Sequence, residues 1–168
     1  MATDMGDPEM IAIPVFPSRH FRHSLIFINS DAGIDEPGDL RGKKVGIPEY
    51  QMTATLWERA ILQHEYDVHP TEMDWIHGGL EEPEREDRLE MDLPDDVSIT
   101  NVSERSLSDM LRDGEIDALL TARNPSSFET DSVERLFPNF KEVEMDYYAR
   151  TGHFPIMHTV ALRQDVYD

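Results

Sequence analysis

Apolar residues along the chain fall into short runs that alternate with longer segments of helical spacing. The runs of strand type are IAIPVF (11–16), HSLIFIN (23–29), KKVGIP (43–48), MDWIHGG (73–79), VSITNV (97–102), IDALLTA (116–122) and FPIMHTVALR (154–163). A helix is predicted over 52–66, where apolar residues recur at helical spacing. A short helix over 106–114 is closed by Gly114. Strands that alternate with helices predict a mainly parallel α/β sheet.

The remaining segments carry weaker patterns. The turn-rich stretch 30–42 predicts a connector, and the acidic stretch 80–96 predicts a solvated loop with a frayed helical turn. Helices or turns are predicted over 132–140 and 143–152, and residues 165–168 begin another helix. One sizeable α/β unit accommodates these segments.

Charge is the strongest compositional feature. The 168 residues include 35 acidic and 15 basic side chains, for a formal net charge of −20. Nucleic acid and anionic membrane surfaces are therefore disfavoured as partners, because phosphate binding needs a basic face. A surface rich in Asp and Glu, with Lys only at Lys43, Lys44 and Lys141, favours a high-salt cytoplasm, where salt screens the repulsion. An ordinary acidic protein is the alternative.

Several classes of protein are disfavoured by what the sequence lacks. There is no Cys, which removes disulfides, thiolate catalysis and zinc–thiolate sites. No stretch approaches the ~20 apolar residues of a membrane-spanning helix. The N-terminus MATDMGDPEM is acidic and has no apolar core, so we expect no signal peptide and a cytoplasmic location.

Five blocks resemble one known family. They are IPVFPSRHFRHS, VGIPEYQMTATLW, GGLEEP, DGEIDALLTARNPSSF and TGHFPIMHTVALRQDVY, which follow in order from about residue 11 to the end. Together they resemble the 4,5-dihydroxyphthalate decarboxylases, which are similar to proteins of the type 2 periplasmic-binding-protein fold.

The resemblance implies a two-lobed protein with its ligand in the cleft, and a chain that carries only part of it. Residues 1–30 would end the first half of lobe 1, residues 31–155 would form the whole of lobe 2, and residues 156–168 would cross back to lobe 1. The missing half of lobe 1 would belong to a longer chain, or to a partner or a second copy of this chain.

The basic loop PSRHFRH is the first candidate site. It holds Arg19, His20, Arg22 and His23 within five positions. Arginine pairs with carboxylates through two parallel hydrogen bonds, and histidine moves protons near neutral pH. Arg19 and Arg22 are therefore predicted to bind a dicarboxylate, with His20 or His23 as the acid–base group. The alternative is a surface loop whose arginines pair with nearby acids.

The join GIPEYQMTATLW (46–57) is the second candidate site. Helix N-termini leave amides unpaired and attract anions. Tyr50, Gln51, Met52 and Thr53 are therefore predicted to contact a ligand carboxylate at the start of the helix. The alternative is that Thr53 only caps the helix and Tyr50 only packs.

Two further loops would face the cleft in the resembling fold. After the run 116–122, Arg123 would act as a second carboxylate clamp, with Ser126 offering a hydroxyl and Phe128 a wall. A surface salt bridge is the alternative for Arg123. Gly78 and Gly79 end another strand, where backbone approaches a ligand closely or simply turns.

Cofactors and metals are not expected. No histidine pair shares the helical spacing of a zinc motif with a Glu, and nothing matches a phosphate loop, a serine nucleophile elbow or a Schiff-base lysine motif. The resemblance implies decarboxylation of 4,5-dihydroxyphthalate to protocatechuate and CO2. A small-carboxylate binding module without catalysis and an inactive remnant are the alternatives, because fold alone does not decide function.

Overall fold

The computed structural model describes residues 10–83 and 96–167. In this part of the chain the strands form a six-stranded sheet and a separate two-stranded ribbon. The larger sheet has the order β5-β4-β3-β6-β2-β7. Its strands are β2 (Ile26–Asn29), β3 (Lys44–Ile47), β4 (Asp74–His77), β5 (Ile99–Asn101), β6 (Ala118–Leu120) and β7 (Val133–Arg135).

Parallel and antiparallel ladders divide the larger sheet into two parts. β3 pairs in parallel with β4 and with β6, and β4 pairs in parallel with β5. β2 runs antiparallel to both of its neighbours, with Ile28 opposite Ala118 of β6 and Glu134 of β7. The predicted α/β class and mainly parallel sheet are confirmed, with β2 and β7 completing the sheet at one side.

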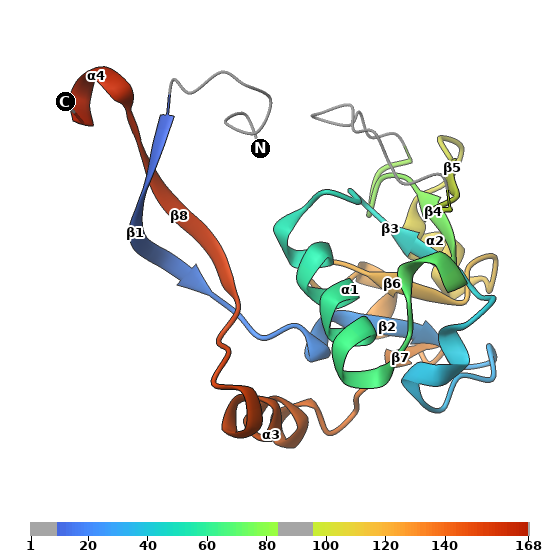
Figure 1. Cartoon of the computed structure of the whole chain (residues 1–168). Helices are drawn as coiled ribbons and strands as arrows, with labels where there is room; N and C mark the ends of the chain where they lie inside the picture. The colour runs from blue at the N-terminus through green and yellow to red at the C-terminus, as the bar shows by residue number, and fades with distance from the viewer. Residues whose placement is uncertain (1–9, 84–95, 168) are drawn as a thin grey trace.

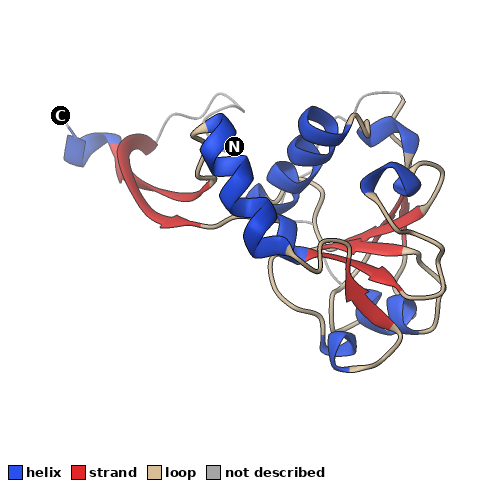
Figure 2. Ribbon diagram, turned by 90° about the horizontal axis from the view of Figure 1, so that it is seen from below, coloured by secondary structure: helices blue, strands red, loops and turns tan. Residues whose placement is uncertain are grey.

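Helices cover both faces of the larger sheet (Figure 2). The α-helices are α1 (Thr53–Tyr66), α2 (Leu107–Arg112), α3 (Phe140–Thr151) and α4 (Gln164–Tyr167). The 3-10 helices are η2 (His23–Leu25), η3 (Pro37–Leu40), η4 (Pro70–Glu72) and η5 (Ser126–Glu129). No described helix is long and apolar enough to cross a membrane.

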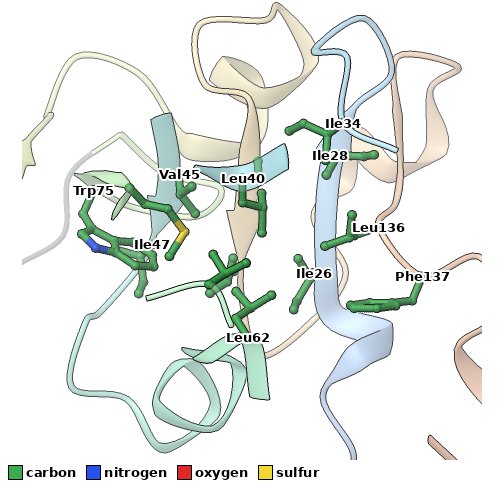
Figure 3. Packing of buried hydrophobic residues seen from close by; sticks show 14 residues of the cluster. Ile26, Ile28, Ile34, Leu40, Val45, Ile47, Leu62, Trp75, Leu136 and Phe137 are labelled. Carbon is green, nitrogen blue, oxygen red and sulfur yellow. The ribbon is translucent and has the colours of Figure 1, made fainter. Parts of the chain in front are cut away.

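The core has two clusters, one on each face of the sheet. Alternation along β2 sends Ile26 and Ile28 to one cluster, which also holds Leu62 of α1. Figure 3 shows this cluster with Trp75 and Phe137 at its margins. Leu25 and Phe27 enter the second cluster, which α2 covers. A strand buried on both faces explains why the run 23–29 is almost continuously apolar.

The two-stranded ribbon projects away from the larger unit (Figure 1). It pairs β1 (Met10–Arg19) with β8 (Ile156–Arg163) in antiparallel register, from Met10 opposite Arg163 to Arg19 opposite Ile156. The register shifts between Ile13 and Ser18, a stretch that includes Pro14 and Pro17. Proline cannot donate to a ladder, which accounts for the irregularity.

Some boundaries differ from the sequence-based prediction. Among the described strands, β2 lies inside the six-stranded sheet while β1 pairs with β8, so residues 26–29 pack with the larger unit. The lobe boundary at residue 30 stays a prediction. The predicted helix or turn over 132–140 contains β7, since Val133 is buried beside β2. The predicted loop over 80–96 lies largely outside the described residues.

Candidate functional site

The predicted site residues come from segments that share one edge of the larger sheet. Because β3, β4 and β6 are parallel, their carboxyl ends meet at this edge. The segments after them carry the join at 48–53, the pair Gly78–Gly79 and the loop beginning at Arg123. β2 is antiparallel to β6, so the basic loop that precedes β2 reaches the same edge. Ligands of open α/β sheets bind outside this edge.

The start of α1 is built by its own backbone. Met52 is the N-cap in an extended conformation, with φ −62° and ψ 137°, and no side chain of a described residue caps the helix. The hydroxyl of Thr55 instead donates to the carbonyl oxygens of Glu49 and Met52, each at 2.9 Å. These hydrogen bonds hold the first turn of α1, which begins at Thr53, without using a side chain as acceptor for its amides. Anion binding at a helix start requires amides that are left unpaired in this way.

Tyr50 packs beside the core. Its ring lies under the Arg59 guanidinium, with the carbon Cζ 3.5 Å from the ring centroid, and it meets Trp75 edge-on at 5.5 Å. Burial raises the pKa of the Tyr50 phenol. Its neighbour Gln51 is buried, with 7 % of its surface exposed. Packing therefore accounts for Tyr50, and the predicted ligand contact at this join rests on Met52 and Thr53.

Packing requires Gly78, the first of the two glycines after β4. A Cβ at Gly78 would lie 2.8 Å from Val102 Cγ2 and 3.1 Å from the Val102 carbonyl oxygen, which leaves no room for a side chain. The carbonyl of Gly79 accepts a hydrogen bond from the Leu107 amide at 2.8 Å. Close approach of the chain to its own backbone explains Gly78.

The loop after β6 already binds a carboxylate of the chain itself, that of Glu81. The amide of Ser126 donates to Glu81 Oε1 at 3.0 Å, and its hydroxyl donates to Glu81 Oε2 at 2.6 Å. The donors predicted to meet a ligand are therefore taken by Glu81. Arg123, by contrast, is exposed and makes no hydrogen bond or ion pair with any described residue. Phe128 packs against Phe27 with ring centroids 5.1 Å apart.

A cavity of about 440 Å³ opens where the ribbon meets the larger unit. We call it the hinge cavity; it is lined by Arg19, His20, Phe21, Ser24, Leu25, Asn124, Arg135, Phe140, Glu144 and Phe154. Its volume lies within the usual range for small-molecule sites. Two cations and three phenylalanine rings share its wall, a combination suited to a flat aromatic anion.

The polar groups of the hinge cavity are fixed by the surrounding backbone. Arg19 Nη1 donates to the Phe154 carbonyl oxygen at 3.1 Å, which leaves further guanidinium donors. Arg135 Nε donates to the Ser24 carbonyl oxygen at 2.8 Å, and the Ser24 amide donates to Glu144 Oε1 at 3.1 Å. His20 is exposed, and its Nδ1 contacts the Phe21 carbonyl oxygen. The predicted residues Arg19 and His20 are thus brought together.

Arg22 is buried between the ribbon and the loop after β6. Its Nε donates to the Met157 sulfur at 3.1 Å, and its Nη1 donates to the Ala122 carbonyl oxygen at 3.5 Å. Burial lowers the pKa of Arg22, while the charges of Glu58 and Glu144 oppose that shift. A thioether is a weak acceptor, so Arg22 is a cation whose partners in this part of the chain are poor.

His23 is enclosed by rings. It is 1 % exposed, and the ring centroids of Phe137 and Tyr147 both lie 5.3 Å from its own. Burial, more than the opposing charge of Glu65, lowers the pKa of His23 to about 4. A neutral, buried imidazole is a poor source of protons at neutral pH, so of the two predicted acid–base residues only His20 has the exposure that the role requires.

Comparison with known proteins finds two similar enzymes of one name. The chain is 43 % identical over 165 residues to 4,5-dihydroxyphthalate decarboxylase from Comamonas testosteroni, covering 96 % of this chain and 50 % of that protein. It is 44 % identical over 149 residues to the enzyme of the same name from Pseudomonas putida, covering 87 % of this chain and 58 % of that protein. Over most of its own length the chain is therefore similar to the 4,5-dihydroxyphthalate decarboxylases. It spans about half the length of the curated relatives it matches.

Structural comparison supports the fold expected of this decarboxylase family. The periplasmic aliphatic sulphonate binding protein SsuA from Escherichia coli superposes with a TM-score of 0.53 at 14 % identity, covering 99 % of this chain and 44 % of that one. This likeness confirms the predicted periplasmic-binding-protein type 2-like architecture and concerns the fold alone. No family model matches the chain.

Sequence reasoning about this chain missed part of the hinge cavity. Arg135 and Glu144 lie far from the basic loop and outside the five blocks, and Asn124 lies within the block DGEIDALLTARNPSSF without having been singled out. The one available signal was Arg135, a cation between the buried residues Val133 and Leu136. Among the described residues no group of His, Asp and Glu is arranged to hold a metal ion.

Proposed function

We propose that the chain forms the ligand-binding part of an enzyme that decarboxylates 4,5-dihydroxyphthalate to protocatechuate and CO2. The observation that carries this proposal is the hinge cavity, where Arg19 and Arg135 stand among phenylalanine rings beside His20. The relatives, named for this reaction, match 96 % and 87 % of the chain. Because the chain spans half of their length, the activity is proposed for the protein that contains this segment.

The chemistry assigns a role to each group. A hydroxyl lies para to each carboxylate of the substrate, and its ionisation pushes electrons into the ring. The ring carbon that bears the carboxylate then takes a proton, and its bond to the carboxyl carbon breaks to release CO2. Arg19 and Arg22 hold carboxylates, and the exposed His20 exchanges the proton. Arg123 and the amides at Met52–Thr53 are proposed as the binding groups on the sheet edge.

Phthalate binding and turnover of 4,5-dihydroxyphthalate test this proposal. We expect the chain to bind phthalate in a calorimetric titration, and Arg19→Ala or Arg22→Ala to weaken binding by ~1.5–3 kcal/mol each. Arg41→Ala is the matched control, since Arg41 pairs with Glu72 on the surface. Release of CO2 with appearance of protocatechuate would establish the reaction.

The outcomes separate the alternatives. Binding without turnover, even in a complete protein, would favour a carboxylate-binding module. Absence of both binding and turnover would indicate an inactive remnant. Equal affinity in the parent and both arginine variants would remove the basic loop from the site.

We also propose that the protein works in a high-salt cytoplasm. The supporting observation is the formal net charge of −20 on 168 residues. At low ionic strength such a charge destabilises the compact state through self-repulsion, and dissolved salt screens it.

A further inference from the structure

Glu58 is a buried acid that the proposed reaction does not use. It lies in the second turn of α1 with 0 % of its surface exposed. Neither of its carboxyl oxygens has a hydrogen-bond partner in the described part of the chain. Buried polar groups in folded proteins are nearly always paired, so an unpaired buried carboxyl needs an explanation.

Two arginines act on this carboxyl, and they differ in how firmly they are held. The charges of Arg22 and Arg59 both favour the ionised form of Glu58. Arg59 is committed elsewhere, because its Nη1 donates to the Tyr50 carbonyl oxygen at 2.6 Å and its guanidinium stacks on the Tyr50 ring. Among the described residues, the acceptors of Arg22 are only the Met157 sulfur and the distant Ala122 carbonyl oxygen.

The charges around Arg22 leave its guanidinium able to pair with the carboxylate of a ligand. Burial raises the pKa of Glu58 well above its usual value despite the two arginines, so this carboxyl loses its proton only at a higher pH than exposed carboxyls do. Glu144 is the other acid whose charge acts on Arg22, and it already accepts the Ser24 amide. With Glu58 protonated, the buried arginine lacks a full counter-charge.

We propose that Glu58 is a positioning residue that takes up a proton when a ligand carboxylate binds Arg22. The inference rests on the proposed function, since it requires a carboxylate ligand. The ligand carboxylate and the Glu58 carboxylate compete for one guanidinium. Ionised Glu58, one proton from solvent and the ligand carboxylate give neutral Glu58 with the ligand paired to Arg22. The neutral carboxyl then neither repels the ligand nor draws Arg22 away from it.

The coupling predicts a pH-dependent affinity. Where Glu58 is ionised in the free protein, binding must include proton uptake, and the affinity for phthalate falls by up to tenfold for each pH unit. Where Glu58 is already protonated, no proton is taken up and the affinity for phthalate does not change with pH. In Glu58→Gln, which keeps the shape of the protonated acid, the fall at higher pH disappears.

Calorimetric titration with phthalate from pH 6 to pH 9, in two buffers of different ionisation enthalpy, counts the protons taken up. At pH values where Glu58 of the free parent is ionised, we expect uptake approaching one proton, and that contribution should be missing in Glu58→Gln. Glu65→Gln is the matched control on the same helix, since Glu65 pairs with Arg150 at 2.7 Å, and it should keep the parent's uptake. A carbon-13 titration of the Glu58 carboxyl in the parent gives a second reading, with a midpoint that rises when phthalate is added.

The outcomes distinguish this inference from the proposed function. Phthalate binding with the same proton uptake in the parent and Glu58→Gln, or an unmoved carboxyl midpoint, would overturn the role of Glu58 alone. Absence of phthalate binding by the parent would overturn the proposed function and the coupling together.

Discussion

The indole of Trp57 donates a hydrogen bond to the carbonyl oxygen of Ile156 at 3.0 Å. Trp57 belongs to α1, and Ile156 is the first residue of β8. The bond therefore ties the helix that begins at the candidate anion site to the strand that leaves the larger unit. The ribbon is joined to the candidate site by a specific contact as well as by chain connectivity.

Replacing this indole tests the connection. We expect Trp57→Phe to lower the free energy of unfolding by about 1 kcal/mol, because the ring is largely kept while the hydrogen bond is lost. Hydrogen exchange of the amides at the start of β8 should become faster, while exchange in β2 and β6 stays slow. Unchanged exchange at Met157 and His158 would show that the bond does not hold the ribbon.

The pH dependence of stability tests the enclosure of His23. The pKa of His23 falls from 6.5 to about 4 on folding, so the unfolded chain binds the proton first as pH falls. The stabilisation is therefore complete above pH 6.5 and is lost as pH falls through about 4, a change of about 3 kcal/mol. His23→Phe should reduce this acid sensitivity, whereas substitution of the exposed His64 should not. Parallel denaturation curves for parent and His23→Phe across this range would contradict the assignment.

Removal of Glu81 tests whether it acts as an internal anion. Glu81→Ala frees the amide and hydroxyl of Ser126. We expect a loss of about 0.5–1.5 kcal/mol in stability, since two hydrogen bonds disappear near the surface. Phthalate binding should tighten because a competing carboxylate is gone. The neighbouring exposed Glu82→Ala is the control, and weaker phthalate binding in Glu81→Ala alone would refute the competition.

A proline at the start of α1 tests the anion site there. Thr53→Pro removes one amide donor, and proline is tolerated in the first helical turn. The extended conformation of Met52 already suits a residue that precedes proline. Phthalate binding should fall while the unfolding temperature of the free protein hardly changes. Thr53→Ala is the control, because it keeps the backbone amide and removes the hydroxyl and so distinguishes the two donors of Thr53. If Thr53→Pro binds phthalate as well as the parent does, packing alone explains the join at 46–57.

Dissolved salt tests the high-salt proposal. The midpoint of thermal unfolding should rise markedly between low-salt buffer and molar KCl, because screening relieves repulsion among the 35 acidic residues. Sucrose is the control for stabilisation by solute exclusion. A midpoint of thermal unfolding that does not change with KCl would instead indicate an ordinary acidic protein.

The sequence by itself determined the elements and the family resemblance. The apolar run at 43–48 and the helical spacing at 52–66 contain β3 and α1, because periodicity is a local property of the chain. Five ordered blocks likewise indicated the resemblance to the 4,5-dihydroxyphthalate decarboxylases without any coordinates. Local patterns also named Arg19 and His20, which line the hinge cavity.

Only the tertiary structure decided which of the named residues are free for a ligand. Two histidines three residues apart became an exposed group, His20, and an enclosed one, His23, because the chain turns inward between them. Gly78 is explained by Val102, and the donors of Ser126 by Glu81, through contacts between segments distant in sequence. The burial of Arg22 and Glu58 and the charges that act on them come from several elements that pack together. A local sequence pattern therefore cannot predict them.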